Sequence, residues 1–249
     1  LYSGDISIQV KVKEDYAGID EVLYEISVDG KVHEKGTLDI SDGSRDANLI
    51  TSVDLCIPVE LDANDISIAV TLVGNVGYKM EKTMRFSIDK TAPVAYMNIS
   101  SGINDAVYQD YYNTDAGIDI QITDMNIDEN LVFLYINGAR LDISSIRQGL
   151  YDESSTTNQY HLELSSEGPI SVSLEMSDRA GNIGEARNLL FTIDKTAPKI
   201  SVNYKDAEDI YYYNHSRKAY VNIEEENIDY SRISIDNRST GIYDIENFN

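Results

Sequence analysis

An eight-residue segment occurs twice in this chain, and this repeat constrains the fold more than any other feature. The sequence F-S-I-D-K-T-A-P runs from Phe86 to Pro93, and F-T-I-D-K-T-A-P runs from Phe191 to Pro198, 105 residues later. Such a period is too long for a helical solenoid unit and matches one β-sandwich domain of roughly 100 residues. The sequence therefore predicts tandem modules, each with its own core.

Shorter matches around the two prolines divide the chain further. Asn126-Ile127-Asp128 returns as Asn227-Ile228-Asp229, and Gly74-Asn75-Val76-Gly77 matches Gly181-Asn182-Ile183-Gly184. We expect a first domain at 1–92 that lacks its first strand, a complete domain at 93–197 and a partial third domain at 198–249. We also expect the protein to continue beyond both termini, or the third segment to be completed by another module or chain.

Alternating apolar and polar residues predict strands along the chain. The segments with this alternation are 6–12, 66–70, 118–122, 170–176 and 220–223. A sheet with one buried face and one solvent-exposed face is typical of an antiparallel sandwich. Asp29-Gly30, Asn137-Gly138, Gly74-Asn75 and Gly181-Asn182 predict turns. A helical period is confined to one or two turns at 141–148. The predicted fold class is all-β, with tandem antiparallel β-sandwiches.

Charge and cysteine content restrict the partners. The formal net charge is −23, from 43 acidic and 20 basic residues. This balance argues against nucleic acid, because phosphate binding needs clustered Lys and Arg. The single cysteine, Cys56, excludes an internal disulfide, so core packing must hold the modules together. No apolar run reaches the roughly 20 residues that span a bilayer, and no signal peptide is recognisable. Either the targeting ends are missing or the protein is cytoplasmic.

The segment S-D-R-A-G-N-I-G-E-A-R-N-L-L-F-T-I-D-K-T-A-P, 177–198, resembles the closing strands of bacterial immunoglobulin-like (Big-type) domains. These occur in tandem on Gram-positive surface or secreted proteins, with an Asp-x-Ala-Gly-Asn turn and a Thr-Ala-Pro hinge. The first module keeps only the Gly-Asn of that turn, at Gly74-Asn75. The resemblance implies that the predicted fold class is all-β, with tandem immunoglobulin-like antiparallel β-sandwiches. It also implies extracellular display, adhesion or spacing and no catalysis. Its fold alone does not determine function.

Catalytic signatures are absent from the sequence. It contains no Gly-x-Ser-x-Gly elbow, phosphate-binding glycine loop, His-Glu-x-x-His or Cys-x-x-Cys. The histidines His33, His161 and His215 share no ligand spacing. We predict that they lie on surface strands or loops and that the protein is not an enzyme.

Acidic residues in turns and links are the candidate metal ligands. Asp124-x-Asn126-x-Asp128-x-Asn130 places oxygen ligands at alternate positions, like the opening of a calcium loop. Glu129 and Tyr135 occupy positions where an EF-hand needs Gly and Glu, so an EF-hand is excluded. A looser calcium site remains an alternative, and a simple role of these residues in turning the chain is favoured over it. Asp89 and Asp194 each begin a D-K-T-A-P segment, 89–93 and 194–198, which we call the first and second links. With Asp124, Asp128 and Asp178 they form the candidate set of metal ligands.

Tyrosines are the candidate ligand-binding residues. They form two clusters: Tyr108, Tyr111 and Tyr112, and Tyr211, Tyr212 and Tyr213. An exposed tyrosine ring can stack on a sugar or anchor a protein partner. Packing at a sandwich edge or against a neighbouring module is the alternative, and recurrence in two copies favours it.

Two functions follow from the sequence. The first is a non-catalytic spacer, stalk or adhesive repeat of a bacterial cell-surface or secreted protein. The second is an accessory module of a secreted enzyme that binds glycan or a host protein. Both place the chain outside the cell, in contact with neighbouring modules and without membrane insertion.

Overall fold

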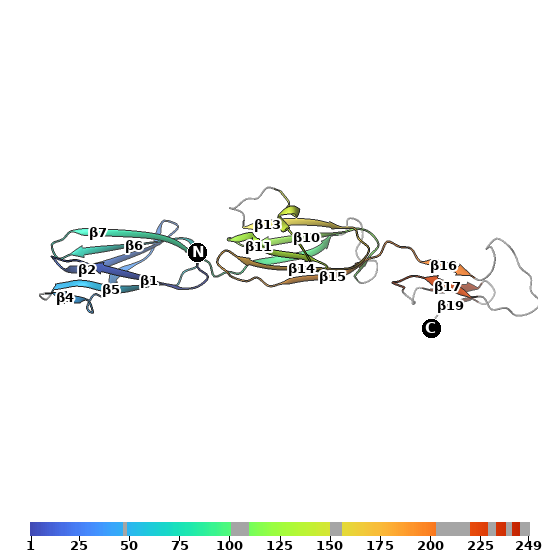
Figure 1. Ribbon diagram of the computed structural model, residues 1–249, viewed down its shortest axis with the longest axis horizontal. Coiled ribbons are helices and arrows are strands. Elements are labelled where there is room, and N and C mark those ends of the chain that lie inside the picture. Colours follow the sequence, from blue (N-terminus) through green and yellow to red (C-terminus); the bar gives the residue numbers. More distant parts are fainter. Residues whose placement is uncertain are drawn as a thin grey trace, which may run out of the picture. The chain divides into compact units, whose positions relative to one another are not determined.

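In the computed structural model, the described residues are 1–46, 49–100, 110–149, 156–202, 220–228, 233–237 and 241–244. Their regular elements are strands and one short 3-10 helix (Figure 1). The fold is all-β, with tandem immunoglobulin-like antiparallel β-sandwiches, as the sequence and its family resemblance predicted. The predicted segments 6–12, 66–70, 118–122 and 170–176 all lie within strands.

The described residues also divide into two compact units. One comprises Leu1–Ser100, Gly117–Glu163 and Ser171–Leu190, and the other comprises the described parts of Ser101–Ala116, Leu164–Ile170 and Phe191–Asn249. The domain boundaries at 92/93 and 197/198 stay a prediction.

The first sandwich contains two sheets with strand orders β1-β5-β4 and β3-β2-β6-β7. Every neighbouring pair is antiparallel. The strands are β1 (Ile6–Lys13), β2 (Ile19–Val28), β3 (Lys31–Leu38), β4 (Ser44–Asp46), β5 (Leu49–Val59), β6 (Ala63–Gly74) and β7 (Lys79–Ile88).

Both sheets of the first sandwich contribute to its core. Strands β1 and β5 supply Val12, Val53 and Leu55, and β2 and β6 supply Val22 and Leu72 to the same apolar cluster. Polar residues alternate with these on the outer faces, as in the pattern along β5. Burial of the apolar face explains why alternation in the sequence predicts these strands.

The second sandwich also contains two sheets, with strand orders β13-β10-β8 and β12-β11-β14-β15-β9. Its elements are β8 (Val94–Ser100), β9 (Tyr111–Tyr112), β10 (Ala116–Thr123), β11 (Ile127–Ile136), β12 (Ala139–Leu141), the 3-10 helix η1 (Ile143–Ile146), β13 (Thr157–Leu164), β14 (Gly168–Asp178) and β15 (Arg187–Ile193). Strand β9 pairs in parallel with β15. Helix η1 confirms the helical turn predicted at 141–148.

Strand β10 shows how the second sandwich sorts its residues between core and surface. Ile118, Ile120 and Ile122 are buried, whereas Asp119 and Gln121 between them are exposed. The exposed face of this strand therefore carries polar side chains in the middle of a three-stranded sheet.

Two hairpins close where the sequence predicts. Asp29-Gly30 joins β2 to β3, and Asn137-Gly138 joins β11 to β12. Both residues of each pair have positive φ, at 50° and 72° and at 49° and 78°. This is the backbone of a type I′ turn, which favours Asn-Gly and Asp-Gly because its twist matches that of the strands.

Four further strands follow the second link. They are β16 (Lys199–Val202), β17 (Val221–Glu224), β18 (Ser234–Asn237) and β19 (Gly241–Asp244). Strands β16 and β17 form one antiparallel pair, and β18 and β19 form another. The predicted strand at 220–223 overlaps β17. Their assignment to a partial third module stays a prediction.

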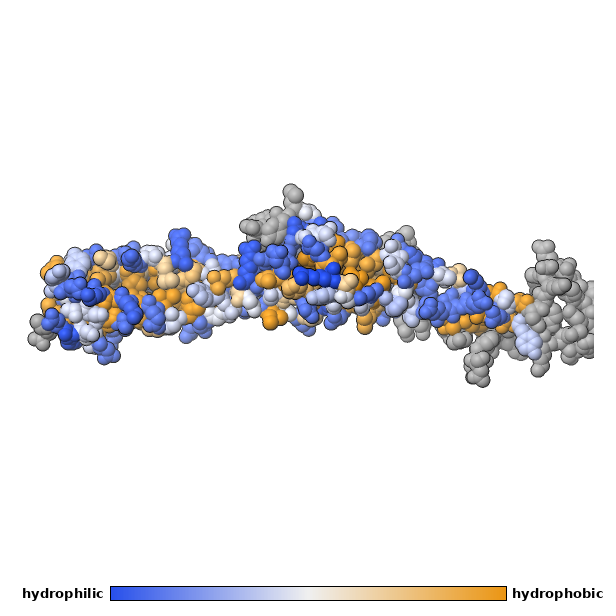
Figure 2. All heavy atoms as spheres, in the orientation of Figure 1, coloured by the Kyte–Doolittle hydropathy of each residue, from blue (hydrophilic) through white to orange (hydrophobic). Residues whose placement is uncertain are grey.

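The surface mixes polar and apolar side chains. Figure 2 shows hydrophilic residues in blue beside scattered hydrophobic patches in orange. Among the described residues, no helix has the length and apolar character needed to cross a membrane.

Candidate functional site

The first link, which follows β7, meets two turns of the second sandwich. One turn follows β10, where Asp124 Oδ1 accepts a hydrogen bond from the backbone N–H of Asn126 at 2.7 Å. The other follows β14, where Asp178 Oδ1 accepts from the backbone N–H of Asn182 at 2.9 Å. The backbone N–H of Arg179 donates to the carbonyl of Asn126 at 3.0 Å and joins the two turns.

These turns bring three buried carboxylates together. Asp89 of the link, Asp124 and Asp178 are 5%, 7% and 1% exposed. One carboxylate oxygen from each lies within 4.8 Å of the other two. In the described part of the chain, none of the three forms an ion pair with Lys or Arg. We call this group the link carboxylate cluster.

The electrostatics of the cluster are unfavourable without a counter-charge. Burial, together with a smaller effect of the nearby Asp89 and Asp178 carboxylates, raises the pKa of Asp124 from 3.8 to about 6. A hydrogen bond from the backbone of Asn126 acts in the opposite direction. Buried carboxylates are normally paired or bound to a metal. Three carboxylate oxygens this close match the ligand type of a hard divalent cation, which takes roughly six to eight oxygens in the case of calcium.

Two asparagines tie the link to these turns. Asn126 Nδ2 donates to Asp89 Oδ2 at 2.5 Å. Asn182 Nδ2 lies 2.8 Å from the carbonyl oxygen of Asp89, 3.1 Å from that of Thr91 and 2.7 Å from Asp178 Oδ2. The Gly-Asn turn is thus anchored to the Thr-Ala-Pro link that precedes its own module. The sequence analysis did not assign this role to either asparagine.

The predicted metal set is brought together only in part. Asp89, Asp124 and Asp178 form the cluster, whereas Asp128 lies outside it. Asp128 Oδ1 accepts from the backbone N–H of Asn130 at 3.0 Å, and its Oδ2 lies 3.7 Å from Arg179 Nε. The hydrogen bond to Asn130 lowers the pKa of Asp128.

Asp194 belongs to the second link, where part of the same arrangement recurs. Asn227 Nδ2 donates to Asp194 Oδ2 at 2.8 Å, as Asn126 does to Asp89. Glu225 accepts from the backbone N–H of Asn227 at 3.1 Å, as Asp124 does from Asn126. A recess of about 460 Å³ surrounds this link and is lined in part by Asp194, Glu224, Glu225 and Asn227.

The tyrosine clusters are only partly visible. Tyr108, Tyr211, Tyr212 and Tyr213 lie outside the described residues. Tyr112 packs edge-to-face on Phe191, with ring centroids 5.7 Å apart, and is half-buried. Tyr111 is 36% exposed and lines the recess at the second link. For Tyr112 this is the packing role that the sequence gave as the alternative to ligand binding.

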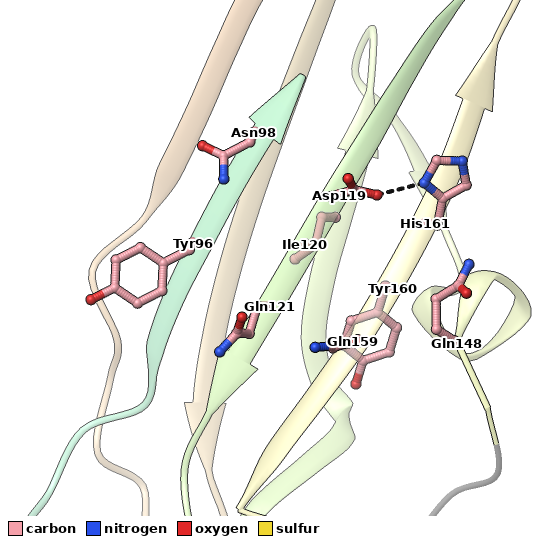
Figure 3. Close-up of a pocket in the computed structure, with 9 residues that line it drawn as sticks. All are labelled: Tyr96, Asn98, Asp119, Ile120, Gln121, Gln148, Gln159, Tyr160 and His161. Atoms are coloured by element: carbon pink, nitrogen blue, oxygen red, sulfur yellow. Dashed lines mark hydrogen bonds and ion pairs between the residues drawn. The ribbon is translucent and has the colours of Figure 1, made fainter. Parts of the chain in front are cut away.

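The two histidines in the described part of the chain, His33 and His161, do not assemble a catalytic group. His33 is exposed on β3, and His215 lies outside the described residues. His161 Nδ1 lies 2.6 Å from Asp119 (Figure 3). Its Nε2 lies 2.8 Å from Glu163. A Ser–His base needs one ring nitrogen on the nucleophile. Both nitrogens of His161 contact carboxylates instead.

Comparison with known proteins adds little beyond the fold. No protein-family model matches the chain, and no curated protein does. Fibronectin(III)-like modules of Clostridium thermocellum CbhA match at 11% identity over 86% of this chain and 93% of that chain, with a TM-score of 0.28. A tandem of titin Ig domains matches at 10% identity, over 78% and 89%, with a TM-score of 0.30. A 1.5-MDa bacterial ice-binding adhesin matches at 15%, over 81% and 62%, with a TM-score of 0.30.

Proposed function

We propose that the chain is a run of non-catalytic immunoglobulin-like modules that serves as a spacer or stalk in a bacterial cell-surface or secreted protein, outside the cell. The observation that supports this role is the repeated link. Each link carries an aspartate that accepts a hydrogen bond from an asparagine on the far side of its proline, Asn126 in one case and Asn227 in the other. A stalk needs such contacts because slack links would let its modules fold back.

Small-angle X-ray scattering of the 249-residue chain tests the spacer role. A compact globule of this length has a radius of gyration of about 18 Å. A stalk gives a much larger radius of gyration. Insertion of the four residues Gly-Ser-Gly-Ser after Thr91 should broaden the distribution of interatomic distances. A radius of gyration near that of the globule would contradict the proposal.

We also propose that the link carboxylate cluster binds calcium. Three buried negative charges with no Lys or Arg partner among the described residues favour a divalent ion. A ligand at 100 times its dissociation constant adds about 2.7 kcal/mol to the free energy of unfolding. We therefore expect calcium to raise the melting temperature of chelator-treated protein, and Asp124→Asn to remove most of that increase.

Asp128→Asn is the matched control for calcium binding, since Asp128 lies at the start of β11, just after the turn that holds Asp124, but outside the cluster. It should retain the calcium-dependent increase in melting temperature. Equal melting temperatures with calcium and with chelator would contradict the calcium site. They would leave the spacer role intact, because the scattering experiment tests it separately.

A second candidate function is binding of a glycan or a host protein by an accessory module of a secreted enzyme. The observation that favours it is a polar groove on the second sandwich.

A further inference from the structure

A groove of about 530 Å³ lies on the exposed face of the sheet β13-β10-β8. Its polar side chains form two rows across the three strands (Figure 3). One row contains Tyr96, Gln121 and Gln159, and the other contains Asn98, Asp119 and His161. The strand register places Tyr96 opposite Gln121 and Asn98 opposite Asp119. Gln148, whose backbone N–H donates to the carbonyl of Gln159 at 2.8 Å, lies at the outer edge.

The composition of the groove is unusual for this chain. The whole sequence contains five glutamines, and three of them, Gln121, Gln148 and Gln159, line the groove. Their side-chain amides and that of Asn98 form no hydrogen bond with other described residues. Each amide offers donors and an acceptor, so the groove presents both kinds of group to a ligand.

Tyr96 provides an aromatic surface beside these amides. It is 60% exposed, and its strand β8 forms the edge of the sheet. A tyrosine ring offers a large apolar face and a polar hydroxyl. An exposed large aromatic residue beside unpaired amides is a combination typical of a binding surface rather than of a merely solvated face.

The first sandwich shows that the fold does not require these residues. Its strands β1 and β5 correspond to β10 and β13, because the backbone N–H of Glu14 donates to the carbonyl of Thr51 as that of Asp124 does to Thr156. In the first sandwich, Lys11 and Asp54 occupy the places of Gln121 and Gln159 and form an ion pair at 3.9 Å.

Strand β8 has its counterpart in β16 of the third segment. The register there places Ser201 opposite Asn222, in the places of Tyr96 and Gln121. The aromatic residue is therefore specific to the second sandwich. A structural requirement would recur with the fold, so this surface points to a function of one module.

Charge limits the ligand. The groove is lined by Asp119 and by no Lys or Arg among the described residues, Glu163 contacts His161 beside it, and the chain carries a net charge of −23. Anionic polymers are disfavoured on such a surface. A ligand rich in hydroxyl groups satisfies amides and a carboxylate without adding charge, and the apolar face of a pyranose ring matches the face of Tyr96.

We propose that this face of the second sandwich binds an uncharged oligosaccharide, with one sugar ring stacked on Tyr96 and neighbouring hydroxyls bonded to Gln121, Gln159 and Asp119. The contacts of His161 with Asp119 and Glu163 hold the second row in place. This inference rests on the second candidate function and is independent of the spacer role and of calcium.

The test uses the full 249-residue chain and a set of defined hexasaccharides. Uncharged probes are hexamers of β-linked glucose, xylose, mannose, galactose and N-acetylglucosamine, and the charged probe is hexagalacturonic acid. Binding is measured by calorimetry and by NMR shifts of the side-chain amides. We expect at least one uncharged hexamer to bind and hexagalacturonic acid not to bind.

Variants then locate the binding surface. Tyr96→Ala should weaken binding at least tenfold. The double variant Gln121→Lys/Gln159→Asp, which installs the charge pair of the first sandwich, should abolish it. Tyr16→Ala is the matched control, since Tyr16 is 93% exposed in the first sandwich and lies outside the groove. These positions are exposed, so unchanged melting temperatures will show that each variant folds.

Three outcomes of the sugar-binding measurements would overturn the inference. They are binding of no uncharged hexamer, equal binding by wild type and Tyr96→Ala, and binding of hexagalacturonic acid alone. A protein ligand that bound this face in place of every sugar would also overturn it. None of these outcomes changes the scattering result, so failure here is distinguishable from failure of the spacer proposal.

Discussion

Ionisation of Asp124 at neutral pH is unfavourable, because the carboxylate is buried beside two other carboxylates. Its pKa is about 6 in the folded protein, above the ordinary 3.8. Between these values the folded state binds the proton more tightly than the unfolded state, so stability falls as pH rises. In chelator, Asp124→Asn should therefore increase the free energy of unfolding at pH 7, by up to about 3 kcal/mol. Urea unfolding at pH 5 and pH 7 measures this.

Asp20→Asn, at an exposed position near the start of β2, controls for the loss of one negative charge. It should change the stability at pH 7 by much less than Asp124→Asn. If Asp124→Asn lowers stability in chelator, the carboxylate has a partner that the link geometry does not explain.

His161 is the second residue whose titration the fold alters. Hydrogen bonds to Asp119 and then Glu163 raise its pKa above 6.5. Because the pKa of His161 is higher in the folded than in the unfolded state, its contacts stabilise the fold fully at pH values below the unfolded pKa. This contribution to the free energy of unfolding is lost as pH rises through the folded pKa. Asp119→Asn should lower the midpoint of His161 in an NMR titration. An unchanged midpoint for His161 would contradict the contact in Figure 3.

The sequence could predict Asp124 and Asp178 as candidates because each stands in a turn motif. It could not predict that Asp128 of the same motif lies outside the cluster, with its Oδ2 3.7 Å from Arg179 Nε of the other turn. The sequence also could not predict that Asn126 and Asn182 bind the first link. Their partners in the link are far away in sequence, and local spacing carries no signal for such contacts.

At the scale of elements, the alternation of apolar and polar residues and the turn residues were sufficient to predict the strands and two of their hairpins. Both depend on local rules, namely burial of one sheet face and positive φ at Asn-Gly or Asp-Gly. The groove could not be predicted in this way. Its rows combine residues from three strands, and the pairing of those strands is a tertiary property. The scarcity of glutamine in the chain is the one sequence signal that could have pointed to it.

Gly184 is required where the chain passes the first link. A Cβ added there would lie 2.5 Å from the carbonyl oxygen of Pro93 and 2.7 Å from Met176 Cε. Because the first of these is backbone, the link itself must shift. We expect Gly184→Ala to lower the free energy of unfolding by about 1–3 kcal/mol, as overpacking does. Chemical denaturation measures the loss.

Gly4→Ala is the control for Gly184→Ala, because nothing lies within 4 Å of a Cβ added at Gly4. It should leave stability nearly unchanged. Equal effects of the two substitutions would show that the close approach at Pro93 contributes nothing measurable.

At the scale of the whole molecule, the repeat predicts more than the number of modules. The equivalent positions of the two links, Asp89 and Asp194, accept hydrogen bonds from equivalent asparagines. What differs is burial. Asp89 is 5% exposed and lies in a cluster of three carboxylates, whereas the bond at Asp194 is exposed. Sequence identity between the links therefore predicts the same bond but not the same energy, because solvent competes more strongly for an exposed hydrogen bond.

Removing the two asparagines tests whether the links act as independent copies. Asn126→Ala removes the donor to Oδ2 of the buried Asp89 carboxylate, whose Oδ1 keeps the backbone N–H of Thr91, and should lower the free energy of unfolding by about 1–3 kcal/mol. Asn227→Ala should cost less, because Asn227 and its bond are exposed. The two bonds share no partner, so the double variant should show the sum of the single losses to within about 0.5 kcal/mol. Calorimetry of the four proteins provides the measurement. A loss in the double variant well above that sum would show that the links are coupled, and a larger loss for Asn227→Ala would contradict the ranking by burial.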